Sequence, residues 1–374
     1  MGNPRYNHSL SSSSQEKTLV IDVGNYATKV GFAGDGYPKF VIPSAVAKIP
    51  SSDIPLMAEE AIFSKEEGKE IIFPFEHEKP WRWESVEEIL MFIFDELRID
   101  TAEINILFSE PTMNHSDNRK KIIETMFDTF QVKRFILVKQ SELALNALWR
   151  RTGMVLEIGH SASYAVPYYE GFEITPAIQK IGITGANIIN QIQKEIEERG
   201  KNPPNMYYLA EKIDKFFYIA NNFEREIQFH ERGLASKDLA RPFPISDEEK
   251  IDFAEERFKI PEMFFQPKLY NLNCPPLIDV ILKVFSKCPM DIRKSLNDNI
   301  LLAGAMTKLP GMDLRLKSEL TKNLPPDQLI RINAHMKREW TSWIGGDALI
   351  SRGLPKEFWH SSIEDAMRKY VPQN

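Results

Sequence analysis

One short pattern occurs twice in this chain, and its residues are of the types that bind a phosphate group beside a divalent cation. The first copy covers residues 20–27 (VIDVGNYA) and the second covers residues 155–162 (VLEIGHSA). In each copy an apolar run ends in a carboxylate, Asp22 or Glu157, and a glycine and a polar turn follow. Such a turn lets backbone N–H groups approach an anion closely, and a carboxylate oxygen binds Mg²⁺ directly or through water.

A second apolar run follows each copy, at residues 30–33 and 164–167, so each copy predicts a β-hairpin with a glycine at its tip. Two facing tips could close on one phosphate chain, with the two carboxylates below them holding a cation. Two ordinary hairpins of a β-rich core are the alternative. Lys29 lies on the returning part of the first hairpin, where its ammonium could reach a phosphate or simply lie in solvent. Tyr164 takes its place in the second hairpin.

Three further candidates for contacts with a nucleotide are Gln140, His160 and the small residues after a later apolar run. Gln140 follows a predicted strand and could orient a water for attack on a terminal phosphate, or it could be a polar residue at a helix start. His160 could donate to a phosphate or be an exposed turn residue. The small residues 303–305 (AGA) follow an apolar run and would allow a nucleotide to lie against backbone, or a helix to pack closely on a strand. The sequence shows no His/Cys cluster with metal-ligand spacing and no Ser/His/Asp set.

The composition favours a two-domain protein of a reducing compartment. The chain has 374 residues, of which 43% are hydrophobic, and this is enough for two cores. Its net charge of −6 gives no electrostatic reason to bind nucleic acid or an anionic membrane, and its two cysteines are too few for a disulfide scaffold. No apolar stretch approaches the roughly 18 residues of a membrane span. Residues 1–16 lack the apolar core of a signal peptide, so we expect a flexible tail on a cytosolic or nuclear protein.

Strands that alternate with helices predict an α/β fold. Ser85 and Glu88 form a capping-box pattern before one apolar stripe at helical spacing, and Ser116 is the expected cap before another. We interpret residues 44–73 as irregular and residues 241–256 as a surface excursion. The predicted helices are residues 85–97, 116–130, 141–149, 185–200, 207–226, 275–286 and 314–324. The predicted strands outside the hairpins are residues 104–108, 135–138 and 300–302. Two similar units, each built on one hairpin, would place a ligand in the cleft between them.

The chain resembles the actin family from about Lys17 to near its C-terminus. Segments spread along the whole length carry the resemblance, whereas sugar kinases and Hsp70-type ATPases share the hairpins but not these segments. The segments are residues 22–25 (DVGN), 29–35 (KVGFAGD), 43–44 (PS), 73–77 (FPFEH), 110–111 (EP), 118–119 (NR), 126–130 (MFDTF), 167–171 (PYYEG), 256–262 (ERFKIPE), 265–267 (FQP), 291–294 (DIRK) and 343–346 (WIGG).

The resemblance implies the actin-like fold, in which two duplicated α/β domains form four subdomains around a cleft for ATP or ADP with Mg²⁺. The outer domain would comprise residues 17–147 and 340–374, with a shortened subdomain 2 at about residues 44–73. The inner domain would comprise residues 148–339, with subdomain 4 at about residues 184–272.

Matching positions imply the site residues. Asp22 and Glu157 would hold the cation through water, and Gln140 would position the attacking water. The phosphates would lie among Gly24, Asn25, Tyr26, Lys29, Gly159, His160 and Ser161. The adenosine would lie near Gly185, Asp214, Gly304 and Ala305.

The departures from actin affect the groups that hydrolysis needs. Actin has Ser and Gly where this chain has Asn25 and Tyr26, and it has Asp-Gly where this chain has His160 and Ser161. The hydrolysis-linked His of actin is Tyr164 here. Because two polar groups near the attacking water have changed, we expect ATPase activity to be weak or absent.

The segment between residues 43 and 73 is shorter than in actin, in the loop with which an actin subunit grips its neighbour. The resemblance therefore indicates an actin-related protein that does not polymerise conventionally and is a structural subunit of a cytoskeletal or motor-associated complex, in a dynactin-like or axonemal setting. Its partners would be other protein subunits, actin and other actin-related proteins among them, without nucleic acid or membrane. We expect it in the cytoplasm on the cytoskeleton, with the cilium as one setting. An ATPase with nucleotide-driven cleft motion and a nuclear chromatin-remodelling subunit are the alternatives.

Overall fold

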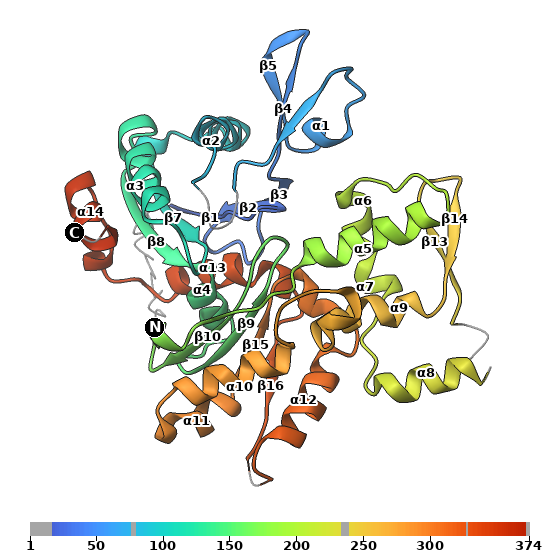
Figure 1. Cartoon of the computed structure of the whole chain (residues 1–374). Coiled ribbons are helices and arrows are strands. Elements are labelled where there is room, and N and C mark those ends of the chain that lie inside the picture. Colours follow the sequence, from blue (N-terminus) through green and yellow to red (C-terminus); the bar gives the residue numbers. More distant parts are fainter. Residues whose placement is uncertain (1–16, 76–79, 233–238, 327, 372–374) are drawn as a thin grey trace, which may run out of the picture.

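The computed structural model describes residues 17–75, 80–232, 239–326 and 328–371, so the expected tail at residues 1–16 lies outside the described residues. Two separate sheets, each covered by helices, form the body of the molecule (Figure 1). Among the described residues, no helix is long and apolar enough to cross a membrane.

The first sheet has the strand order β3-β2-β1-β7-β8 and contains the first predicted hairpin. β1 and β2 are antiparallel, with Asp22 opposite Lys29, whereas β1, β7 and β8 are parallel. The apolar run of β1 is buried throughout, which is typical of a central strand covered on both faces. The strands are β1 (Thr18–Asp22), β2 (Ala27–Phe32), β3 (Phe40–Pro43), β7 (Asn105–Glu110) and β8 (Arg134–Lys139).

The second sheet repeats this plan with the second predicted hairpin. Its order is β11-β10-β9-β15-β16, and β12 also pairs with β10. β9 and β10 are antiparallel with Glu157 opposite Tyr164, and β15 runs parallel to β9. The two hairpins thus have the same position and register in their sheets. The strands are β9 (Gly153–Ile158), β10 (Ser163–Tyr169), β11 (Phe172–Glu173), β12 (Gln179–Lys180), β15 (Ile300–Ala303) and β16 (Ile332–Ala334).

The prediction of an irregular segment at residues 44–73 was wrong. A three-stranded sheet with the order β5-β4-β6 and one short helix fill this segment, which projects at the top of Figure 1. Pro50 and Ser51 form the turn between β4 and β5. Strands this short, with an exposed outer face, carry too few apolar residues for a clear period. The elements are β4 (Val46–Ile49), β5 (Ser52–Met57), α1 (Ala58–Phe63) and β6 (Glu70–Ile72).

All of the predicted helices except the one over residues 207–226 are present, but two of the expected caps are wrong. Ser85 lies inside its helix and is buried, because the helix begins at Trp83, with Arg82 at the N-cap position. His115, rather than Ser116, caps the next helix by accepting from the backbone N–H of Asp117. The helices that match predictions are α2 (Trp83–Leu97), α3 (Ser116–Glu124), which continues as a π-helical turn at Thr125–Thr129, α4 (Gln140–Ala147), α5 (Gly185–Glu198), α10 (Leu277–Lys287) and α12 (Met312–Asn323).

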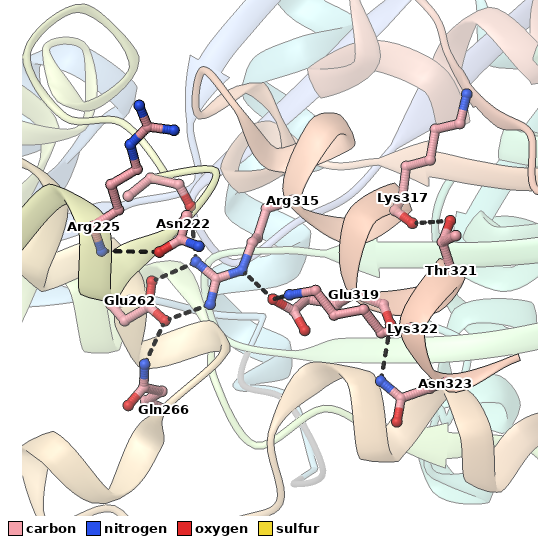
Figure 2. Close-up of polar contacts among 11 residues, drawn as sticks. Asn222, Arg225, Glu262, Gln266, Arg315, Lys317, Glu319, Thr321, Lys322 and Asn323 are labelled. Carbon is pink, nitrogen blue, oxygen red and sulfur yellow. Dashed lines mark hydrogen bonds and ion pairs between the residues drawn. The ribbon is translucent and has the colours of Figure 1, made fainter.

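The helix predicted over residues 207–226 is broken into three pieces, and residues 217–222 between the last two are not helical. Contacts from distant residues hold this stretch: the N–H of Ile219 donates to the carbonyl of Pro310, and Arg315 Nη1 donates to the carbonyl of Ala220 at 2.8 Å. The guanidinium of Arg315 also contacts Glu262, as Figure 2 shows. The pieces are α6 (Met206–Ala210), α7 (Ile213–Phe216) and α8 (Phe223–Glu231).

The segment of residues 241–256, predicted as a surface excursion, also differs from the prediction. It contains a two-stranded antiparallel sheet of β13 (Arg241–Pro244) and β14 (Lys250–Phe253), whose Phe243 and Phe253 are fully buried.

The remaining helices are α9 (Glu256–Lys259), α11 (Met290–Asn297), α13 (Thr341–Ser351) and α14 (Ile363–Tyr370). Short 3₁₀ turns are Thr101–Glu103, Thr175–Ala177, Ile260–Phe264, Pro267–Tyr270, Ala305–Lys308, Arg338–Trp340 and Lys356–Phe358.

Each sheet has its own hydrophobic core, and α4 and α13 pack against each other between the two sheets (Figure 1). The helices approach so closely because Gly345 has no side chain: a Cβ there would lie 1.8 Å from the carbonyl oxygen of Leu143. Next to it, Trp343 is fully buried and its indole N–H donates to the carbonyl of Val20 at 3.1 Å. This crossing joins the part of the chain that carries Gln140 to the first sheet.

Replacing Gly345 by alanine is expected to lower the free energy of unfolding by about 1–3 kcal/mol, because α13 must move away from the backbone of α4. Urea unfolding of the full chain measures this. Ser351→Ala, at the exposed end of the same helix, is the matched control and should change stability little. Equal stabilities of the two variants would contradict the close crossing.

Candidate functional site

A cavity of about 330 Å³ opens between the two hairpin tips. The carboxyl ends of β1 and β9 both reach it, as do the residues that follow β7 and β15. Open α/β sheets bind ligands at this position, where the parallel strands end. The predicted site residues that line the cavity are Asp22, Gly24, Asn25, Tyr26, Lys29, Gln140, Glu157, Gly159, His160, Ser161, Gly304 and Ala305. Gly185 and Asp214 are not among its lining residues.

Asp22, the carboxylate of the first hairpin, is 2% exposed and is held by donors from three elements. The hydroxyl of Ser109 on β7 donates to it at 2.7 Å, and the amide of Gln140 on α4 donates at 3.0 Å. The ammonium of Lys29 on β2 lies 3.2 Å away. The hairpin register that places Lys29 opposite Asp22 therefore produces an ion pair at the edge of the cavity.

Gln140 is the first residue of α4, and its side-chain nitrogen serves the first hairpin. Besides Asp22 it donates to the backbone carbonyl of Val23 and, at 3.3 Å, to the hydroxyl of Ser109. The amide nitrogen therefore joins α4 to the carboxyl end of β1. A role in positioning a water would have to use the amide oxygen.

Glu157, the carboxylate of the second hairpin, accepts a hydrogen bond from the hydroxyl of Thr112 at 3.0 Å. The pKa of Glu157 is raised to about 7, chiefly by burial and with a contribution from the charge of Asp22, whereas Thr112 and Lys29 act to lower it. Two carboxylates that disfavour each other's charge across a polar cavity are a suitable environment for a cation.

The donor set decides what kind of cation fits. In the ranges that the structure describes, no group of three or more His, Cys, Asp or Glu side chains is placed to hold a metal ion. Asp22 and Glu157 supply hard carboxylate oxygens, and the structure describes no third carboxylate grouped with them. This arrangement suits Mg²⁺, which keeps several waters and is commonly bound through one or two carboxylates together with phosphates.

Gly185 lies behind the second tip. Its N–H donates to the carbonyl of Gly159 at 2.8 Å, so the start of α5 is fastened to the tip. Gly304, which follows β15, has a φ of +88°, and a Cβ there would lie 2.3 Å from the carbonyl oxygen of Ile158. Both glycines thus allow close packing against the second hairpin. For residues 303–305, such close packing was the alternative to a nucleotide contact.

Asp214 lies on α7 and lines a second cavity of about 240 Å³, which also contains Glu211 and Ala305. The ammonium of Lys308 lies 3.1 Å from Asp214 and 3.2 Å from Glu339. Lys308 and Glu339 line the main cavity as well, so this ion-pair network connects the two cavities. The charged side chains that connect the two cavities are therefore both positive and negative.

Aromatic rings connect the two tips. The ring of Tyr26 on the first tip stacks on that of Tyr207 from α6, with centroids 4.5 Å apart, and lies 5.6 Å from the ring of His160 on the second tip. The hydroxyl of Tyr207 donates to the carbonyl of Tyr26 at 2.9 Å. Burial lowers the pKa of His160 to about 4, so this ring is neutral at physiological pH.

The family model for actin matches residues 13–225 and 206–364 of this chain. The chain belongs to the actin family. These two segments cover most of the chain, and the mixed α/β structure with its repeated hairpin has the actin-like fold that the resemblance implied. Actin-family proteins generally bind a nucleotide with a divalent metal ion, and the cavity between the hairpin tips is where the residues of this actin-family chain could hold them.

Four residues that sequence reasoning missed contact the site of this actin-family chain. Ser109 and Thr112 hold the two carboxylates, Lys308 pairs with Asp214, and Tyr207 stacks on Tyr26. Ser109 had a readable signal, because polar residues at the carboxyl end of a buried parallel strand commonly face a ligand site. Tyr207 had none, because its partner lies far away in the sequence.

We expect this actin-family chain to lose more stability than its His160→Gln variant as the pH falls from 6.5 toward 4. Because burial lowers the pKa of His160 from 6.5 to about 4, the unfolded chain binds a proton in this window that the folded chain does not. Stability rises with pH wherever the unfolded state binds more protons, so it falls on acidification, here by about 1–3 kcal/mol.

Urea unfolding of both chains at neutral and mildly acidic pH measures this difference. The raised pKa of Glu157 acts in the opposite direction, since the folded chain is then the one that binds the proton. That effect is present in both chains and cancels in the comparison. The same loss of stability in both chains would contradict a partly buried His160 that stays neutral in the folded chain.

Proposed function

We propose that this chain is an actin-related protein that serves as a structural subunit of a larger cytoskeletal assembly, and that its cleft holds ATP or ADP with Mg²⁺ with little or no hydrolysis. Its partners would be other protein subunits, with actin and other actin-related proteins among them. A cytoplasmic location on the cytoskeleton, in a dynactin-like or axonemal complex, accords with this role.

One contrast supports this proposal. The residues expected to hold the cation are present, whereas positions that the resemblance links to hydrolysis carry other residues than in actin. Asp22, Lys29 and Glu157 lie together at the cavity, with supporting donors from Ser109 and Thr112. These groups supply what a phosphate chain and its Mg²⁺ need.

The altered positions lie on the second hairpin. Tyr164 stands where the resemblance expects the hydrolysis-linked His of actin, and it is buried beside Val155 and Val166. A tyrosine is not a base near neutral pH, because its ordinary pKa is about 10. The site therefore favours retention of a nucleotide over its hydrolysis.

The segment of residues 44–73 supports the absence of conventional polymerisation. Pro50 and Ser51 alone connect β4 to β5, and Ile49 pairs directly with Ser52. The loop with which an actin subunit grips its neighbour is correspondingly short here. A fixed position in a complex, with contacts specific to that complex, fits such a surface.

The test uses purified full-length chain with excess Mg·ATP. We expect phosphate release at the background rate, unchanged by Gln140→Ala, and no long filaments in electron micrographs. Long filaments of the pure chain would overturn the proposed structural role.

A working ATPase is the second candidate, since Asp22, Lys29 and Gln140 form one contact network. Phosphate release well above background that is lost in Gln140→Ala would establish it. The same preparation thus separates the two functions.

A further inference from the structure

The space between the two hairpin tips is partly filled by aromatic side chains. Tyr26 and His160 stand on opposite tips, both line the cavity, and their ring centroids lie 5.6 Å apart. Aromatic rings in contact have centroids about 4.5–7 Å apart, so these rings touch across the gap. No phosphate group fits between two rings in contact.

The ring of Tyr26 is held in this position from several sides. It stacks on Tyr207, which is 5% exposed and packs in a buried cluster with Ala45 and Ile62. The carbonyl of Tyr26 accepts from the hydroxyl of Tyr207 at 2.9 Å and from the N–H of Ser44 at 3.2 Å. Rotation of the ring away from the gap would break this stack and open the cluster.

The charges at the cavity also limit the length of phosphate chain it accepts. Both lysines that the structure describes along the cavity are already paired with carboxylates. Lys29 lies 3.2 Å from Asp22, and Lys308 lies 3.1 and 3.2 Å from Asp214 and Glu339. A longer phosphate chain therefore adds negative charge that meets no unpaired lysine, and Arg338 is the one other Lys or Arg that the structure describes along the cavity.

We propose that the cleft selects a nucleoside diphosphate over a nucleoside triphosphate, and that Tyr26 is the residue that excludes the terminal phosphate. The inference rests on the proposed nucleotide binding and specifies its ligand. A diphosphate reaches Lys29 and the two carboxylates, whereas a triphosphate must extend into the gap where the two rings meet. Binding of the triphosphate then costs the stack between Tyr26 and Tyr207.

Calorimetric titration of the full-length chain with Mg·ADP and with a Mg-bound, non-hydrolysable ATP analogue tests the proposal. We expect the diphosphate to bind about tenfold or more tightly, as is usual when a pocket lacks room for one group. Tyr26→Ala should raise the affinity for the analogue and bring the ratio of the two affinities close to one. Tyr169→Ala, exposed at the far end of β10 from the tip, is the matched control and should leave the ratio unchanged.

His160→Ala removes the ring on the other tip and keeps the test valid if Tyr26→Ala does not fold. This variant should also bring the affinities for Mg·ADP and for the ATP analogue closer together. Equal affinities of the wild type for the two nucleotides, or a ratio unchanged in the variants, would overturn this inference and leave the proposed function standing. Failure of both nucleotides to bind would overturn the proposed function itself.

Discussion

Replacing Arg315 by alanine is expected to lower the free energy of unfolding by about 3–5 kcal/mol, because it leaves a buried carboxylate without its partner. Glu262 is fully buried and Arg315 is 5% exposed, and the guanidinium donates to both carboxylate oxygens, at 3.0 and 3.3 Å. The amide of Gln266 donates to the same carboxylate at 3.0 Å, as Figure 2 shows. Arg315 also holds the carbonyl of Ala220, so its loss frees the non-helical stretch at residues 217–222.

Chemical denaturation of the full chain measures the effect. Lys322→Ala is the control on the same helix: its ammonium lies 3.0 Å from Glu319 but the side chain is largely exposed, so its loss should cost less than about 1 kcal/mol. The double replacement Arg315→Met with Glu262→Leu should recover much of the stability, since a buried ion pair can be exchanged for apolar residues. Equal losses for Arg315→Ala and Lys322→Ala would contradict the described burial of the pair.

Asp22→Asn is expected to weaken binding of Mg·ADP by about 10–100-fold, which is the usual cost of losing a group that acts on a metal through its bound water. The carboxylate is the acceptor for Ser109, Gln140 and Lys29, and the variant replaces one acceptor oxygen by an N–H donor. The ammonium of Lys29 then lacks its partner, and the cation loses one of its two carboxylates.

Calorimetric titration at a temperature where circular dichroism shows both chains folded measures this loss. Asp53→Asn, which removes an exposed carboxylate on β5, is the matched control and should bind as the wild type does. An unchanged dissociation constant in Asp22→Asn would place the cation elsewhere in the cleft.

Local patterns in the sequence were enough to predict the two hairpins and most of the helices. Apolar runs flanking a glycine turn predicted the first hairpin, in which the structure places Asp22 opposite Lys29. The apolar stripe of α2 is likewise encoded within a few residues. The family resemblance extended this to the overall fold.

Long-range contacts account for what the sequence did not predict. Residues 217–222 are not helical because the carbonyl of Ile219 faces Gly311, where a Cβ would lie 2.2 Å away, and its N–H bonds to Pro310. Tyr207 reaches Tyr26 across the cleft in the same way. Contacts between residues so far apart produce no local pattern in the sequence, so they cannot be predicted from it and are seen only in the structure.

We propose that the cleft holds a nucleotide with Mg²⁺ and that this ligand stabilises the fold. Thermal unfolding of the full-length chain at increasing concentrations of Mg·ADP tests it most directly, because a ligand that binds the folded state alone adds about 2.7 kcal/mol at a hundred times its dissociation constant. We predict a midpoint that rises steadily with ligand concentration and returns to its starting value when EDTA removes the metal. A midpoint that stays the same at every concentration of Mg·ADP would contradict nucleotide binding in the cleft.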